Sequence, residues 1–86
     1  MKSLISNYIN LLTIDKLNDF GLKNDIKLKK EELEFILDMV KNNFEDILVN
    51  EDKYLNLLKN KVNEDNYTKI VDLFKYYKQR YKGFLF

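Results

Sequence analysis

The sequence predicts an all-α fold, a compact orthogonal bundle of about five helices in one domain spanning residues 1–86. Apolar residues recur every three or four positions along most of the chain, which is the spacing of one helix face. At 45% hydrophobic and 14% aromatic residues, the chain carries enough apolar surface to form a small core. Proline is absent, so helix boundaries are predicted from caps and from shifts in apolar spacing.

The N-terminal part of the chain predicts two helices and a connector. The first helix, about residues 4–12, is apolar around so much of its circumference that we expect it to be central to the core. Thr13 is a typical N-cap residue and predicts a second helix that ends near Asn24. Residues 24–28 alternate polar and apolar side chains, which predicts an extended connector with its two apolar side chains in the core.

The remaining helices follow from apolar stripes and start signals. A third helix over about residues 30–43 carries one inward stripe, and residues 44–49 predict a shorter continuation. Asn50 and Asn63 are each followed by two acidic residues, which is the pattern of an N-cap and first turn. The last helix, about residues 64–82, is predicted to be the longest element.

The residue types that are absent restrict the function. The chain has no His and no Cys, the residues on which most proton transfer, nucleophilic attack and metal ligation depend. With only two glycines it also has no phosphate-binding glycine loop. We therefore expect no catalytic activity, no cofactor and no metal site. No stretch approaches the ~20 apolar residues of a membrane span, and the zero cysteine count weighs against a secreted scaffold, so we expect a soluble, cytoplasmic protein.

Three carboxylates on the third predicted helix are the strongest argument for chemistry. Glu31, Glu34 and Asp38 share roughly one side of this helix, where they could act as acid and base or hold a divalent cation. A solvated acidic face gives the same pattern, and it is the interpretation that we favour.

The basic, tyrosine-rich end is a candidate nucleic-acid surface. Residues 69–86 hold five basic residues against one acidic residue, although the whole chain has a net charge of only +1. Cations beside stacking rings are a recognised mode of nucleic-acid binding. An amphipathic helix whose lysine stems lie along a buried face shows the same pattern. The candidate phosphate contacts are Lys75, Lys78, Arg80 and Lys82.

Two groups of apolar residues are candidate protein interfaces. Phe35 and Met39 lie four residues apart on the third predicted helix, away from its main stripe, so this helix is expected to have a second neighbour. That neighbour is either another helix of the chain or a partner, including a second copy. Phe84 and Phe86 follow the last helix and either fold back onto the core or contact a partner.

The order of apolar and capping residues also resembles a known family. The relevant segments are Asn7-Tyr8-Ile9-Asn10, Leu12-Thr13, Ile26-Lys27-Leu28, Leu57-Leu58 and Lys69-Ile70-Val71-Asp72-Leu73-Phe74. Their order is similar to that of the uncharacterised YqfT-type family of short helical proteins from low-GC bacteria. This resemblance implies a compact, intracellular, all-helical domain and assigns a function to no residue.

Taken together, these patterns predict a small binding module without catalysis that acts through protein–protein contacts, with a partner protein or as a homodimer. Nucleic-acid binding through the C-terminal helix is the alternative. A small antagonist protein that blocks a larger target fits the sequence equally well. A helix-turn-helix is not favoured, because its second helix, over residues 30–43, is acidic and would repel a phosphate backbone.

Overall fold

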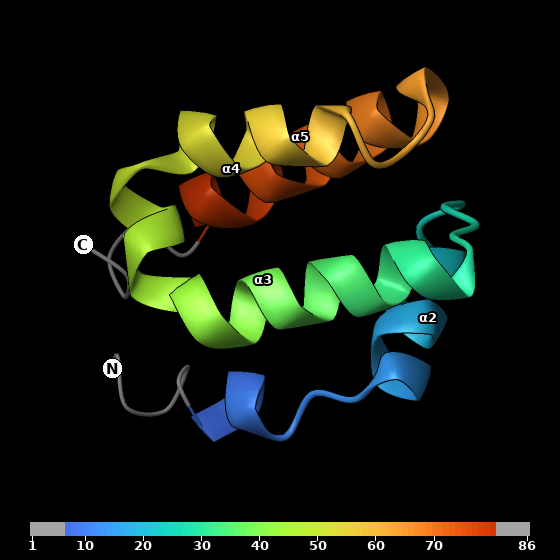
Figure 1. The fold of residues 1–86 in the computed structure, drawn as a ribbon, viewed down its shortest axis with the longest axis horizontal. Coiled ribbons are helices and arrows are strands. Elements are labelled where there is room, and N and C mark those ends of the chain that lie inside the picture. The colour runs from blue at the N-terminus through green and yellow to red at the C-terminus, as the bar shows by residue number, and fades with distance from the viewer. Residues whose placement is uncertain (1–6, 81–86) are drawn as a thin grey trace.

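The computed structural model describes residues 7–80, and every regular element within that range is helical (Figure 1). Residues 7–10 are helical and are followed by α2 (Ile14–Lys23), α3 (Lys30–Val49), α4 (Glu51–Lys59) and α5 (Glu64–Arg80). The predicted all-α bundle is confirmed. The Cα radius of gyration is 12.3 Å, close to the value of about 12 Å expected for a folded chain of this length.

Helices begin directly after all three predicted cap residues, and two of these residues cap through their side chains. Thr13 accepts a hydrogen bond at Oγ1 from the main-chain nitrogen of Lys16 at 3.2 Å, and so caps α2. Asn63 caps α5 through Oδ1, which accepts from the main-chain nitrogen of Asn66 at 2.7 Å. Asn50 occupies the N-cap position of α4 but makes no capping bond. Its side-chain nitrogen instead donates to Asp46 Oδ1 at 2.7 Å, because the carboxylate lies one turn earlier on α3.

One bend divides α3 close to the predicted boundary between residues 43 and 44. Asn43 has φ −133° and ψ 22°, which is not helical, yet helical hydrogen bonding resumes after it. Its side-chain Nδ2 donates to the main-chain oxygen of Met39 at 3.2 Å, within the interrupted turn. The two predicted pieces therefore form one bent helix.

The core lies around α3, which Figure 1 shows between α2 on one side and α4 with α5 on the other. Its centre is a cluster of Ile36, Leu58 and Val62, with side chains of α2, α3 and α5 packed around it. The buried apolar residues are Leu12, Ile26, Leu33, Ile36, Ile47, Tyr54, Leu58 and Val62.

The described part of the first helix is not central to this core, contrary to the sequence-based expectation. Tyr8 and Leu11 are 65% and 67% exposed, whereas Ile9 is half-buried and Leu12 is buried. The segment therefore packs by one side only. The prediction was wrong because apolar residues around most of a helix do not determine how many neighbours that helix has.

The connector between α2 and α3 places its apolar residues inward as predicted, and it also contains a sharp turn. Asp25 has a positive φ of 61°, which reverses the chain after α2 and directs Ile26 into the core, where it is buried. The main-chain nitrogen of Ile26 donates to Gly21 O at 2.8 Å. A Cβ atom on Gly21 would lie 3.0 Å from the oxygen of Ile26, so glycine permits this close approach.

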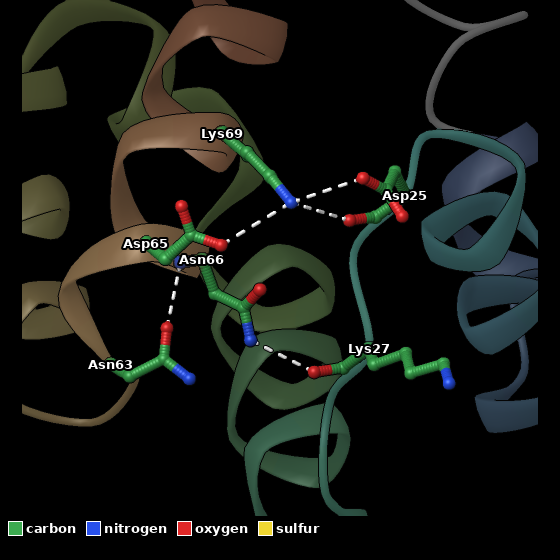
Figure 2. A network of polar contacts seen from close by, with 6 residues as sticks. All are labelled: Asp25, Lys27, Asn63, Asp65, Asn66 and Lys69. Atoms are coloured by element: carbon green, nitrogen blue, oxygen red, sulfur yellow. Dashed lines mark hydrogen bonds and ion pairs between the residues drawn. The ribbon is translucent and has the colours of Figure 1, made fainter.

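A polar network fixes α5 against the connector, as Figure 2 shows. Lys69 Nζ donates to the main-chain oxygen of Asp25 at 3.0 Å and lies 3.2 Å from its carboxylate and 3.3 Å from that of Asp65. These contacts, with Asp25 first and Asp65 second, raise the pKa of Lys69 above its ordinary value of 10.5. Asn66, which is 7% exposed, donates from Nδ2 to Lys27 O at 2.8 Å.

Candidate functional site

An open groove with a volume of about 980 Å³ lies between α4 and α5. Each helix contributes residues spaced three, four or one position apart, so each wall is one continuous helix face. From α4 these are Glu51, Asp52, Leu55 and Asn56, and from α5 they are Tyr67, Val71, Lys75, Lys78 and Gln79. We call this surface the α4–α5 groove.

The groove is apolar at one end and charged at the other. A short turn joins α4 to α5, and we use it to distinguish the two ends. Leu55, Tyr67 and Val71 lie in the half towards this turn, and all three are half-buried. The charged residues lie in the other half, near the start of α4 and the end of α5. The groove therefore offers an apolar floor at one end and a charged rim at the other.

One ion pair crosses the charged half. Lys78 Nζ lies 2.6 Å from Glu51 Oε1, and both side chains are about one third exposed, at 32% and 29%. On the two rims, Asp52 belongs to α4 and Lys75 to α5, and both are exposed. Within residues 7–80 neither of these two forms an ion pair. The rims thus present one acid and one base to a bound molecule.

A second surface joins α2 to the other flank of α5. The rings of Phe20 and Tyr77 lie 5.8 Å apart between centroids, and those of Tyr76 and Tyr77 lie 5.2 Å apart, edge to face. Tyr76 is 55% exposed, and Arg80 Nη1 donates to its hydroxyl at 3.4 Å. We call these four residues the aromatic surface.

The predicted phosphate contacts are distributed over both surfaces. Lys75 and Lys78 line the α4–α5 groove, where Lys78 pairs with Glu51, whereas Arg80 belongs to the aromatic surface. Lys82 lies outside the described residues. Among the described residues, no single basic patch brings these cations together, since acidic side chains of α4 share the groove with two of them.

Of the two predicted protein-interface residues on α3, Phe35 has a contact within the fold. Phe35 is half-buried and packs against the core cluster, and Lys61 Nζ lies 5.4 Å from the centroid of its ring. Met39 is also half-buried. At Phe35, the second neighbour that the sequence predicted for this side of α3 is therefore another part of the same chain. Phe84 and Phe86 lie outside the described residues.

The acidic residues of α3 form no ion-binding cluster in the described range. Glu31, Glu34 and Asp38 are exposed, and residues 7–80 contain no group of three or more potential ligands that could hold a metal ion. None of the helices in this range combines the length and the apolar character that a bilayer crossing requires.

The carboxylate with the most contacts is Asp46, near the end of α3. It accepts a hydrogen bond from the Tyr54 hydroxyl and another from Asn50, and Lys53 Nζ lies 3.6 Å from its Oδ2. These contacts, with Tyr54 first, hold the pKa of Asp46 below its ordinary value of 3.8. The same hydrogen bond raises the pKa of Tyr54 above 10.0. This group joins α3 to α4 and so positions one wall of the groove.

The sequence analysis did not identify the α4 wall of the groove. A signal was present, because Leu55 and Leu57 extend the apolar surface of α4 beyond the buried pair Tyr54 and Leu58. The same reasoning that gave α3 a second neighbour applies to α4. In the structure Leu55 is half-buried and lines the groove. Leu57 lies on another side of α4 and is 47% exposed.

Comparison with models of known protein families, with curated proteins and with solved structures found no match to this chain. The resemblance to the YqfT-type family stays a prediction. Any functional interpretation therefore depends on the geometry of the two surfaces described above.

Proposed function

We propose that this protein is a small non-catalytic binding module that acts through protein–protein contacts, and that the α4–α5 groove is its binding surface. The observation that carries the proposal is the partly covered apolar floor formed by Leu55, Tyr67 and Val71. Apolar surface gathered in a groove and surrounded by polar side chains is typical of a protein-binding site. A partner that covers this floor removes its apolar area from water, which favours association.

Nucleic-acid binding is supported less well by the same surface. A phosphate backbone in the groove would approach Glu51 and Asp52 as well as Lys75. The charge of Lys78 is already compensated by Glu51 at 2.6 Å, which weakens its attraction for a phosphate. The groove therefore favours a partner that carries both signs of charge over a polyanion.

Affinity capture from native lysate tests the proposal with a matched pair of valine variants. Val71→Lys places a charge on the groove floor, and Val49→Lys places the same charge at the end of α3, where the side chain is 74% exposed. We expect the wild type and Val49→Lys to retain the same protein by mass spectrometry, with and without nuclease. Recovery with Val71→Lys should fall about tenfold, equivalent to about 1.4 kcal/mol of binding free energy.

Circular dichroism and a thermal melt of each variant separate loss of binding from loss of folding. Lys75→Glu supplies a second groove variant at an exposed position, where a substitution changes the charge and leaves the core intact. Recovery that disappears with nuclease would favour nucleic-acid binding. Equal recovery by both valine variants would exclude the groove, and the absence of any protein enriched over a bare tag would contradict the proposed function.

Sedimentation of the purified protein addresses a second copy as the partner. A mass of twice 10.4 kDa that falls to the monomer value in Val71→Lys would identify the partner as another copy of the chain. A monomer at every concentration would leave a different protein as the partner.

A further inference from the structure

We propose that the occupant of the α4–α5 groove is a single amphipathic helix of a partner protein, and this inference rests on the proposed function. One apolar face of that helix packs on Leu55, Tyr67 and Val71. Beyond this face, an acidic side chain lies opposite Lys75 and a basic side chain lies opposite Asp52.

The shape of the groove favours a helix. On α5, Tyr67, Val71 and Lys75 follow one another at intervals of four residues, and on α4 Glu51 and Leu55 have the same interval. Such rows run along the helix axis, so the two walls form a trough between neighbouring helices. A helix with its side chains is about 10 Å across, and two turns of it occupy on the order of 850 Å³. The groove volume of about 980 Å³ is of this size.

The backbone of the groove also limits the occupant. Both walls are helical, and residues 7–80 contain no strand to which an extended peptide could add by main-chain hydrogen bonding. A partner must therefore satisfy its own main-chain groups when it covers the apolar floor. A helix does so within its own segment, which is the basis of the helix-in-groove mode of recognition.

The charges of the rim specify the occupant further. Glu51 and Lys78 compensate each other across the groove, so the remaining rim charges are those of Asp52 and Lys75. These two belong to opposite walls and have opposite signs. A helix with an acid on one flank and a base on the other complements both rims, whereas a uniformly charged helix is repelled by one of them.

A displayed peptide library tests this inference directly, with the full chain as the target. The library encodes peptides of about 15 residues, long enough for four helical turns. We expect the wild type to enrich peptides with apolar residues at positions i, i+3 or i+4, and i+7, flanked by acidic residues on one side and basic residues on the other. A synthesised peptide from the enriched set should bind Val71→Lys about tenfold more weakly than Val49→Lys.

Charge reversal supplies a more specific readout than loss of binding. Lys75→Glu is expected to enrich basic residues at the flank where the wild type enriches acidic ones, and Asp52→Lys is expected to do the opposite at the other flank. Each exchange should weaken binding of the wild-type peptide by about 1.4- to fivefold, the range that corresponds to the energies of exposed ion pairs. Both positions are exposed, so these variants retain the fold.

Amide chemical shifts locate the peptide on the protein. Changes confined to the groove-lining residues of α4 and α5 would support the inference, and changes centred on the aromatic surface would overturn it. A library that enriches no peptide, or only extended or uniformly charged peptides, would also overturn it. If the library gives one of these results and recovery of the captured protein still falls with Val71→Lys, the proposed function stands and only the helical occupant is wrong.

Discussion

Asn66 donates a hydrogen bond from its side-chain nitrogen to the main-chain oxygen of Lys27, 2.8 Å away, and this bond ties α5 to the connector that precedes α3. Figure 2 shows that it lies beside the contacts of Lys69 with Asp25. The connector and α5 are far apart in the sequence, so these polar contacts fix how α5 lies over the core and hence the position of one wall of the α4–α5 groove.

Replacement of this asparagine tests the contribution of the bond. Asn66→Ala removes the donor to Lys27 O in a buried environment, which is expected to lower the free energy of unfolding by about 1 to 3 kcal/mol. Asn42→Ala, at an exposed position of α3, controls for the higher helix propensity of alanine. Urea unfolding measures both variants. Equal midpoints for the two would show that the bond to Lys27 adds nothing.

The cap of α2 gives a second stability prediction. Thr13→Ala removes the Oγ1 acceptor that the main-chain nitrogen of Lys16 uses, and we expect a loss of about 1 kcal/mol. Thr68→Ala makes the same chemical change at an exposed position inside α5, where alanine favours the helix. The thermal midpoint should therefore fall for the first variant and stay the same or rise for the second. A fall of the same size in both would argue against the cap.

Gly21 provides a test in which helix propensity and packing oppose each other. Alanine inside a helix is ordinarily about 1 kcal/mol more favourable than glycine. At this position its Cβ would lie 3.0 Å from the main-chain oxygen of Ile26, so the connector must move. We expect Gly21→Ala to lower the stability, while Asp19→Ala, at an exposed position of α2, does not. A Gly21→Ala protein that gains about 1 kcal/mol in chemical denaturation would show that the connector yields freely.

The hydrogen bond between Tyr54 and Asp46 predicts a pH dependence. Because the pKa of Asp46 in the folded chain is below its ordinary value of 3.8, the contribution of this carboxylate to stability is fully present above that value. It is lost as the pH falls through the lowered pKa. Tyr54→Phe removes the main cause of the shift, so the pKa of Asp46 should rise towards 3.8 and the loss of stability in acid that is due to this carboxylate should become smaller.

Carbon-detected NMR titration of the Asp46 carboxyl group measures this shift directly. Tyr67→Phe is the matched control, because this half-buried tyrosine lies on α5 and donates no hydrogen bond to Asp46. An unchanged pKa of Asp46 in Tyr54→Phe would contradict the assignment. At alkaline pH the sign is opposite: the pKa of Tyr54 is raised above 10.0, so its contribution is present below that value and is lost as the pH rises through the raised pKa.

The sequence predicted the local features of the fold better than the number of neighbours that each helix has. Thr13 and Asn63 cap helices as expected because capping depends on a few adjacent residues. The exposure of Tyr8 and Leu11 was not predicted, because an apolar face indicates a need for cover and does not show whether cover is present.

The same limitation explains why the groove was missed. Val71 is one of the apolar residues that recur at helical spacing along α5, a pattern typical of a core face, but in the structure it is half-buried and lines the groove. Whether such a residue is in the core or on a binding surface depends on which helix packs beside it, and that is set by tertiary contacts that spacing along the chain does not encode. The burial of Asn66 was also beyond the pattern, because its partner Lys27 is distant in sequence.

The bend at Asn43 has a consequence for how this chain tolerates insertions and deletions. In a straight helix, one added residue rotates every later side chain by about 100° around the axis. The irregular backbone at Asn43 sets the orientation of the last turns of α3, which include Asp46 and Ile47, separately from that of the turns before it. An insertion or deletion that the irregular turn at Asn43 absorbs would therefore leave the side chains before and after it in their packed positions. The same insertion or deletion near Ile36 would displace the core cluster.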